Sequence, residues 1–217
     1  MSDSFPLQNV PLFRGLEEGE MQSVLQCLSA NVRDYTKGET IFHPGCPVKE
    51  VGLVLEGQVH LVKEDRWGNT ALLSTIPPGE LFGESYACAG APLPLRATAA
   101  ECCRILFLNM GKMLTTCSPT CRFHARLLEN LLSILAGKNL FLAQKADILA
   151  QRTVREKLLN YLYYQSQMHS SSCFTIPLNR QQLADYLSVD RSSMTVELGK
   201  LSKEGVLKVE RNKFELL

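Results

Sequence analysis

Hydrophobic residues follow three different spacings along the 217-residue chain. Near the amino terminus, apolar residues at helical spacing predict a short amphipathic helix containing Met21, Val24, Leu25 and Leu28. From residue 32 to about 116, short apolar segments such as "VGLVLEGQVHLVKED" are separated by Gly and Pro turns. Many short strands at this spacing are typical of a β-barrel or sandwich.

A long helix is predicted for residues 118–150. Its leucines follow alternating steps of three and four with two longer steps, and further apolar residues widen the stripe beyond one face. Such a helix needs a partner for its second face, and the seam is consistent with a coiled-coil dimer. The residues predicted to form the dimer contact are Leu128, Leu131, Leu135 and Leu142. The alternative is that the whole stripe packs on the barrel of its own chain.

Two short helices separated by a turn are predicted within residues 178–201. Asn179 and Gln182 form a capping-box pattern before the first helix, and Asp190 can cap the second. An inner apolar face on the second helix is supplied by residues spaced four and three apart, Met194, Leu198 and Leu201. This is the layout of a helix-turn-helix, whose second helix presents its first residues to base edges. A helical hairpin that merely packs is the alternative.

The final residues predict a small hairpin around Arg211-Asn212, which would make the unit a winged helix-turn-helix. Cations at the hairpin tip suit contact with phosphates, which position a protein on DNA without specifying sequence. The residues expected to contact DNA are Arg180, Gln181, Arg191, Ser192, Thr195, Val196, Lys200, Arg211 and Lys213.

Charge and composition change this picture little. The formal net charge is +1, while residues 151–217 hold ten Lys/Arg against seven Asp/Glu, a weak basic bias compatible with DNA binding. No run of about eighteen apolar residues predicts a membrane span, and the amino terminus has no secretory signal pattern. The eight cysteines contain no C-x-x-C pair, so reduced thiols in a cytoplasmic protein are expected.

In order and spacing, these segments resemble the cyclic-AMP receptor protein/FNR (CRP/FNR) family of bacterial transcription regulators. The segments "PLFRGL", "KGETIFHPG" and "GNTALLSTIPPGELFGES" resemble its entry segment and sensor, and "LNRQQLADYLSVDRSSMTVELGKLSKEGVLKV" resembles its helix-turn-helix and wing. The resemblance implies an α+β fold. It places an N-terminal cyclic-nucleotide-binding-type β-roll (a double-stranded β-helix) at residues 1–117, a long dimerisation helix at 118–150 and a C-terminal winged helix-turn-helix at 151–217.

The same resemblance implies a function. A homodimer would sense a small molecule or another intracellular signal in the β-roll and reposition two recognition helices on a pseudo-palindromic site in double-stranded DNA. RNA polymerase is a further partner that an activator of this family would contact. The alternative is a cyclic-nucleotide-binding module that acts on a protein partner and does not need the winged helix-turn-helix.

An effector site in the β-roll is also implied by the resemblance. In cyclic-nucleotide-binding members, a carboxylate accepts from the ribose and a guanidinium holds the phosphate. The matching residues here are Gly83, Glu84, Ser85, Arg96, Ala97 and Thr98.

Two departures disfavour cyclic AMP as the effector. The stretch "SYACAGAPLPL" between Glu84 and Arg96 is longer than in those members and carries two prolines. The middle of the long helix, "GKNLFLAQ", lacks the hydroxyl residues that touch the base. Leu140 and Phe141 at this point favour a more apolar ligand or none.

Metal and enzyme chemistry have little support. One face at the start of the long helix carries Cys117, Cys121 and His124. A soft metal could bind there, but thiols that pack against the barrel are the commoner arrangement. No metal site is therefore predicted. A cupin enzyme needs several closely spaced histidines, whereas His43 and His60 are seventeen residues apart. The protein is therefore not expected to be an enzyme.

The second short helix departs from the family at two positions that contact bases. The family commonly has an Arg, a Glu and a second Arg at the positions of Arg191, Ser192 and Val196. This chain keeps the first Arg and has Ser192 and Val196 at the other two positions. Val196 offers an apolar surface that suits a thymine methyl. We therefore expect an operator richer in A·T than those of the best-known members.

Overall fold

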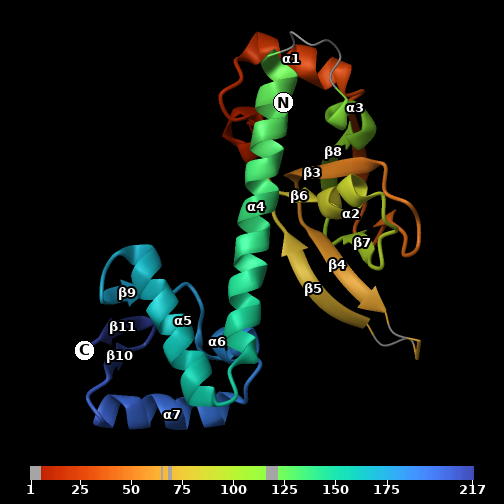
Figure 1. Cartoon of the computed structure of the whole chain (residues 1–217). Coiled ribbons are helices and arrows are strands. Elements are labelled where there is room, and N and C mark those ends of the chain that lie inside the picture. Colours follow the sequence, from red (N-terminus) through yellow and green to blue (C-terminus); the bar gives the residue numbers. More distant parts are fainter. Residues whose placement is uncertain (1–5, 65, 68–69, 116–121) are drawn as a thin grey trace. The chain divides into compact units, whose positions relative to one another are not determined.

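The computed structural model of the chain describes residues 6–64, 66–67, 70–115 and 122–217 (Figure 1). The chain divides into two compact units, residues 1–136 and 137–217, and the division falls inside the long helix α4 (Arg122–Ala150). Each unit is described separately below.

The first unit contains two antiparallel four-stranded sheets. One has the order β1 (Asn31–Tyr35), β8 (Cys103–Asn109), β3 (Glu50–Glu56) and β6 (Leu81–Phe82). The other has the order β2 (Thr40–Phe42), β7 (Arg96–Ala99), β4 (Val59–Glu64) and β5 (Thr70–Ile76). One apolar cluster contains residues from both sheets, so the core of the roll lies between them. Beside this cluster, the centroid of the Phe42 ring lies 5.5 Å from that of Phe82 and 5.9 Å from that of Phe107.

The other face of the first sheet is covered by helices. Successive side chains of a strand point to opposite faces, and on β8 Ile105 and Phe107 enter the roll core while Leu106 and Leu108 enter a second cluster. The covering elements are η1 (Leu7–Asn9), η2 (Pro11–Phe13), α1 (Glu18–Cys27) and the first turns of α4, which together contribute Leu12, Phe13, Val24, Leu127 and Leu131. The short helices α2 (Glu84–Ala89) and α3 (Met110–Leu114) complete the unit.

The burial of Leu131 corrects one sequence-based expectation. Leu131 is only 2% exposed and packs with Leu127 in the core of its own unit, so it is not available to a second chain. The adjacent Leu132 is 65% exposed and takes its place in the exposed stripe. Helical spacing alone does not decide which of two neighbouring leucines turns inward.

Gly52 on β3 is required by the packing of the roll. A Cβ at this position would lie 2.3 Å from the ring of Phe82, which is itself 2% exposed. We expect Gly52→Ala to lower the free energy of unfolding by about 2 kcal/mol, because overpacking forces a buried ring out of place. Denaturant unfolding measures this effect. Gly19→Ala is the control, because its Cβ meets nothing within 4 Å, and equal stability of the two variants would contradict the prediction.

The second unit is a winged helix-turn-helix. The end of α4 is followed by α5 (Val154–His169), β9 (Cys173–Thr175), α6 (Arg180–Leu187), α7 (Arg191–Lys203), β10 (Leu207–Glu210) and β11 (Lys213–Leu216). The three strands form a sheet of order β10-β11-β9, so the predicted terminal hairpin is present and a third strand joins it. One apolar core holds the unit together and includes Leu158, Leu183, Met194, Leu198 and Phe214.

Candidate functional site

The exposed helix α7 begins at a well-formed cap. Asp190 Oδ1 accepts hydrogen bonds from the backbone N–H of Ser193 at 2.9 Å and from its hydroxyl at 3.2 Å, and the Ser192 hydroxyl also donates to it. These donors, led by Ser192, hold the pKa of the Asp190 carboxyl below its usual range. Because the cap is built from adjacent residues, the start of α7 is determined locally.

The two faces of α7 have different environments. Met194, Leu198 and Leu201 are buried in the core of the unit, as the sequence predicts. The residues expected to contact base edges are exposed on the other side, Arg191, Ser192, Thr195 and Val196. Val196 is 58% exposed, which leaves its methyl groups open to a partner. The Thr195 hydroxyl donates to the carbonyl of Arg191 at 2.8 Å, so towards DNA it can act as an acceptor.

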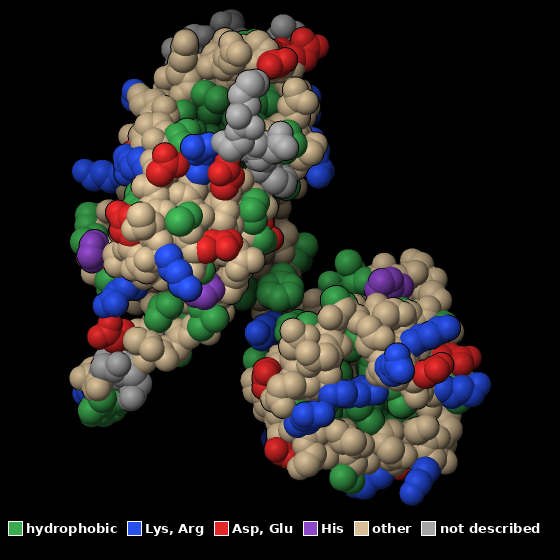
Figure 2. Space-filling model, turned by 180° about the vertical axis from the view of Figure 1, so that it is seen from behind, with side chains coloured by type: hydrophobic (Ala, Val, Ile, Leu, Met, Phe, Trp, Pro, Cys, Tyr) green, Lys and Arg blue, Asp and Glu red, His purple; other side chains and the backbone are tan. Residues whose placement is uncertain are grey.

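Residues on α6 and the wing lie beside this helix in the fold. The guanidinium of Arg180 stacks over the Phe214 ring, with its carbon 5.2 Å from the ring centroid, and burial lowers the pKa of this arginine. Gln181 donates to Asp185 at 2.8 Å. Arg211 and Lys213 are exposed at the hairpin turn, where Arg211 adopts a φ of +52°. In Figure 2 the Lys and Arg side chains of this unit are interspersed with Asp and Glu.

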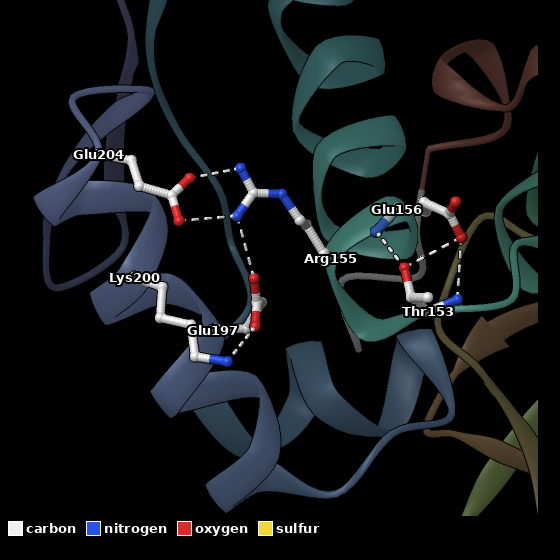
Figure 3. Close-up of polar contacts among 6 residues, drawn as sticks. All are labelled: Thr153, Arg155, Glu156, Glu197, Lys200 and Glu204. Carbon is white, nitrogen blue, oxygen red and sulfur yellow. Dashed lines mark hydrogen bonds and ion pairs between the residues drawn. The ribbon is translucent and has the colours of Figure 1, made fainter.

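An ion-pair network joins α5 to α7 (Figure 3). Arg155 donates to both carboxylate oxygens of Glu204, at 3.2 and 2.5 Å, and to Glu197 at 3.2 Å. The other oxygen of Glu197 accepts from Lys200 at 3.2 Å, so this predicted phosphate contact already has a carboxylate partner. The hydrogen bond from Arg155 lowers the pKa of Glu204, and the same contact raises the pKa of Arg155.

A second set of contacts joins the end of α4 to the helix-turn-helix. The ring of Phe141 lies 6.5 Å from that of Tyr186 on α6, which in turn lies 5.3 Å from Tyr161 on α5. Lys145 Nζ stands 4.9 Å from the centroid of the Tyr186 ring. Burial raises the pKa of Tyr161 to about 12. Phe141, predicted as an effector contact, is therefore part of the contact between α4 and α6; its neighbour Leu140 is 70% exposed.

Six of the implied effector residues lie at the start of α2 and on β7. Gly83 adopts a φ of +80° before the first turn of α2, and a Cβ there would come within 3.2 Å of the Phe42 ring. Glu84 is 4% exposed, and the Ser85 hydroxyl lies 3.5 Å from its carboxylate. Thr98 on β7 is half-buried and pairs with Thr40.

Two of the implied effector residues, Ala97 and Arg96, have other contacts in the fold. The side chain of Ala97 is fully buried in the core of the roll, so only its backbone is available to a ligand. Arg96 forms an ion pair with Glu64 on the neighbouring strand, with 2.6 Å between Nη2 and Oε2. An anionic ligand that uses Arg96 must therefore compete with a carboxylate.

We expect Glu64→Gln to strengthen the binding of cyclic nucleotides by a factor of about 1.4 to 5, because a half-exposed ion pair contributes about 0.2–1 kcal/mol. Calorimetric titration with a panel of cyclic nucleotides measures the change. Glu56→Gln is the control, since Glu56 pairs with Arg104 instead. Unchanged or weaker binding by Glu64→Gln would show that Arg96 is not the phosphate contact.

The helix face considered for metal binding lies partly outside the described residues, because these do not include Cys117 and Cys121. His124 is 1% exposed, and its Nε2 lies 3.2 Å from the carbonyl oxygen of Lys112. Within the described ranges there is no group of three or more His, Cys, Asp or Glu side chains arranged to hold a metal. None of the described helices is long and apolar enough to cross a membrane.

Both units match known protein families. The model of the cyclic nucleotide-binding domain matches residues 32–119, and that of the Crp-like helix-turn-helix domain matches residues 156–217. The cyclic AMP receptor protein of Thermus thermophilus is 25% identical over 203 residues, which cover 94% of this chain and 90% of that protein.

Solved structures agree with these matches. The N-terminal domain of a transcriptional regulator from Streptomyces coelicolor is 25% identical with a TM-score of 0.52, and the match covers 61% of this chain and 94% of that one. The c-di-GMP-responsive global regulator CLP of Xanthomonas campestris is 20% identical with a TM-score of 0.53, covering 92% of this chain and 99% of that one. This second likeness shows the fold alone.

Proposed function

We propose that the chain is a DNA-binding transcription regulator of the CRP/FNR family. It acts as a homodimer whose β-roll senses a small molecule and whose paired α7 helices read a pseudo-palindromic operator. The observation that carries the proposal is the exposed row on α7, Arg191, Ser192, Thr195 and Val196, presented by a buried inner face and flanked by a wing. Such a regulator acts in the cytoplasm, on the bacterial chromosome.

Exposed apolar residues on α4 support a dimer. Leu132 and Leu142 are 65% and 61% exposed, and with the half-buried Leu128 and Leu135 they continue a repeat of four and three residues. Four apolar residues in such a row on a long helix suit a two-stranded coiled coil. The exposed Asn139 falls in the same repeat, where a single polar residue favours a two-stranded pairing in register.

The effector proposal rests on the start of α2. A buried carboxylate, Glu84, directly after a left-handed glycine is suited to accept hydrogen bonds from a ligand hydroxyl. The ion pair between Arg96 and Glu64 and the lack of hydroxyl residues in the middle of α4 argue against cyclic AMP. A signal that shifts α4 would reach α6 through Phe141 and Tyr186, which gives the sensor a route to the recognition helix.

Binding to the DNA upstream of the protein's own gene tests the proposal. We expect a gel-shift assay to show two chains on one duplex, with a footprint whose half-sites are about 34 Å apart, one helical turn. In vitro transcription with RNA polymerase then separates activation from repression. A protein that binds its upstream DNA no better than a scrambled duplex would contradict the proposal.

A further inference from the structure

Glu197 holds two cations on one flank of the recognition helix. Its carboxylate accepts from Arg155 through one oxygen and from Lys200 through the other, each at 3.2 Å (Figure 3). The Glu197 side chain is 15% exposed, against 59% for Lys200. The carboxylate is therefore held in place in the fold, whereas the ammonium group of Lys200 lies at the surface.

The position of Arg155 is set by the first turn of α5. Thr153 and Glu156 form a reciprocal capping box. The backbone N–H of Glu156 donates to the Thr153 hydroxyl at 3.1 Å, and the backbone N–H of Thr153 donates to the Glu156 carboxylate at 3.0 Å. Arg155 lies between these two residues and extends to Glu197 on α7 and to Glu204, the C-cap residue of that helix. These ion pairs therefore connect the flank of α7 to the capped start of α5.

The charges within this network cancel. Arg155 and Lys200 are matched by Glu197 and Glu204, so the four side chains together add no net charge to the flank of a helix that binds a polyanion. An arginine–carboxylate pair with two parallel hydrogen bonds keeps its geometry better than a lysine pair. The Lys200–Glu197 pair is the one that a nearby phosphate could open.

We propose that Glu197 withholds Lys200 from the DNA phosphates and so lowers the sequence-independent affinity, which leaves the base contacts by the exposed row on α7 a larger share of the binding free energy. The inference rests on the proposed DNA-binding function. Each phosphate contact adds about 0.9 to the slope of log affinity against log salt and strengthens binding to any sequence equally. A lysine freed on the flank would therefore raise the affinity for every DNA sequence and leave the preference for the operator unchanged.

Glu197→Gln tests the proposal, because it keeps the shape of the side chain and removes its charge. On a scrambled duplex we expect the salt slope to steepen by about 0.9 and the affinity at low salt to rise about threefold or more. The ratio of operator affinity to scrambled-duplex affinity should stay the same, because the freed contact strengthens binding to both duplexes equally. Fluorescence anisotropy over a series of salt concentrations measures all three quantities, and thermal unfolding checks that the variant is folded.

Two further variants separate charge release from loss of structure. Glu204→Gln weakens the tie between α5 and α7 but leaves the Lys200–Glu197 contact, so its salt slope should stay close to that of the unaltered protein. In the double variant Glu197→Gln/Lys200→Gln, the added slope should disappear. An unchanged slope in Glu197→Gln, or an equal increase in the absence of Lys200, would overturn the proposal.

The same measurements distinguish this inference from the proposed function. If the unaltered protein does not prefer its own upstream DNA, the operator proposal fails, while the slope on a scrambled duplex still decides the role of Glu197. If the operator is preferred and the Lys200-dependent slope is absent, only the inference about Glu197 fails.

Discussion

Replacing Leu142 by glutamate is expected to convert the protein to a monomer and to weaken operator binding by at least about a hundredfold. Leu142 is 61% exposed and continues the repeat of Leu128, Leu132 and Leu135 on α4. A carboxylate without a partner is strongly disfavoured inside an apolar seam. A monomer contacts one half-site at a time and loses the effective concentration that links the two, a factor of about 10²–10⁴.

Sedimentation equilibrium and gel-shift assays with whole and half operators measure the two effects. The matched control is Ser133→Glu, which places the same charge at an exposed position of α4 outside the apolar repeat. We expect the control to remain dimeric and to bind the whole operator normally. A dimeric Leu142→Glu protein would show that chains associate through another surface.

Removing the Arg191 side chain is expected to weaken specific binding about 5- to 150-fold, or roughly 1–3 kcal/mol, with little change on scrambled DNA. Arg191 is the first residue of α7, is exposed, and follows the Asp190 cap that fixes the start of the helix. A guanidinium at this point can bind both acceptors of a guanine edge. The expected loss is therefore concentrated at one base pair of each half-site.

Competition assays with operators altered at single base pairs measure the expected loss. Lys203→Ala is the control, because Lys203 is an exposed cation in the last turn of α7 and should affect all sequences alike. An Arg191→Ala protein that keeps its full preference for the operator would assign recognition to other residues. Site selection from random DNA tests the A·T-rich expectation for Val196 in the same assay.

Local signals in the helix-turn-helix were predicted correctly. The capping box of Asn179 and Gln182 is present, with each side chain bonded to the backbone of the other residue at 2.9 Å. The inner face of α7 follows from helical spacing, and the terminal hairpin follows from two apolar runs around Arg211-Asn212. These features depend on residues a few positions apart, whose contacts are determined by backbone geometry.

The sequence did not predict the contacts between residues that are far apart in the chain. Arg155 reaches Glu197 and Glu204 across 42 and 49 positions, and Arg96 reaches Glu64 across 32. Glu197 lies on α7 and Glu204 caps the end of that helix seven residues later, and this spacing predicts a shared acidic flank but no partner for it. The choice between Leu131 and Leu132 failed for the same reason, since it depends on how α4 lies against the first sheet.

The sequence by itself therefore determined the helix-turn-helix with its terminal hairpin and the buried face of α7, because these features follow from short-range spacing and capping, while the resemblance to a family implied the order of the domains. Only the tertiary structure decided which charges are available. Arg155 and Arg96 are cations in the sequence, but in the fold each faces a carboxylate far along the chain, at 3.2 and 2.6 Å. The physical reason is that ion pairing depends on distances of a few ångströms, which packing sets between residues far apart in the chain.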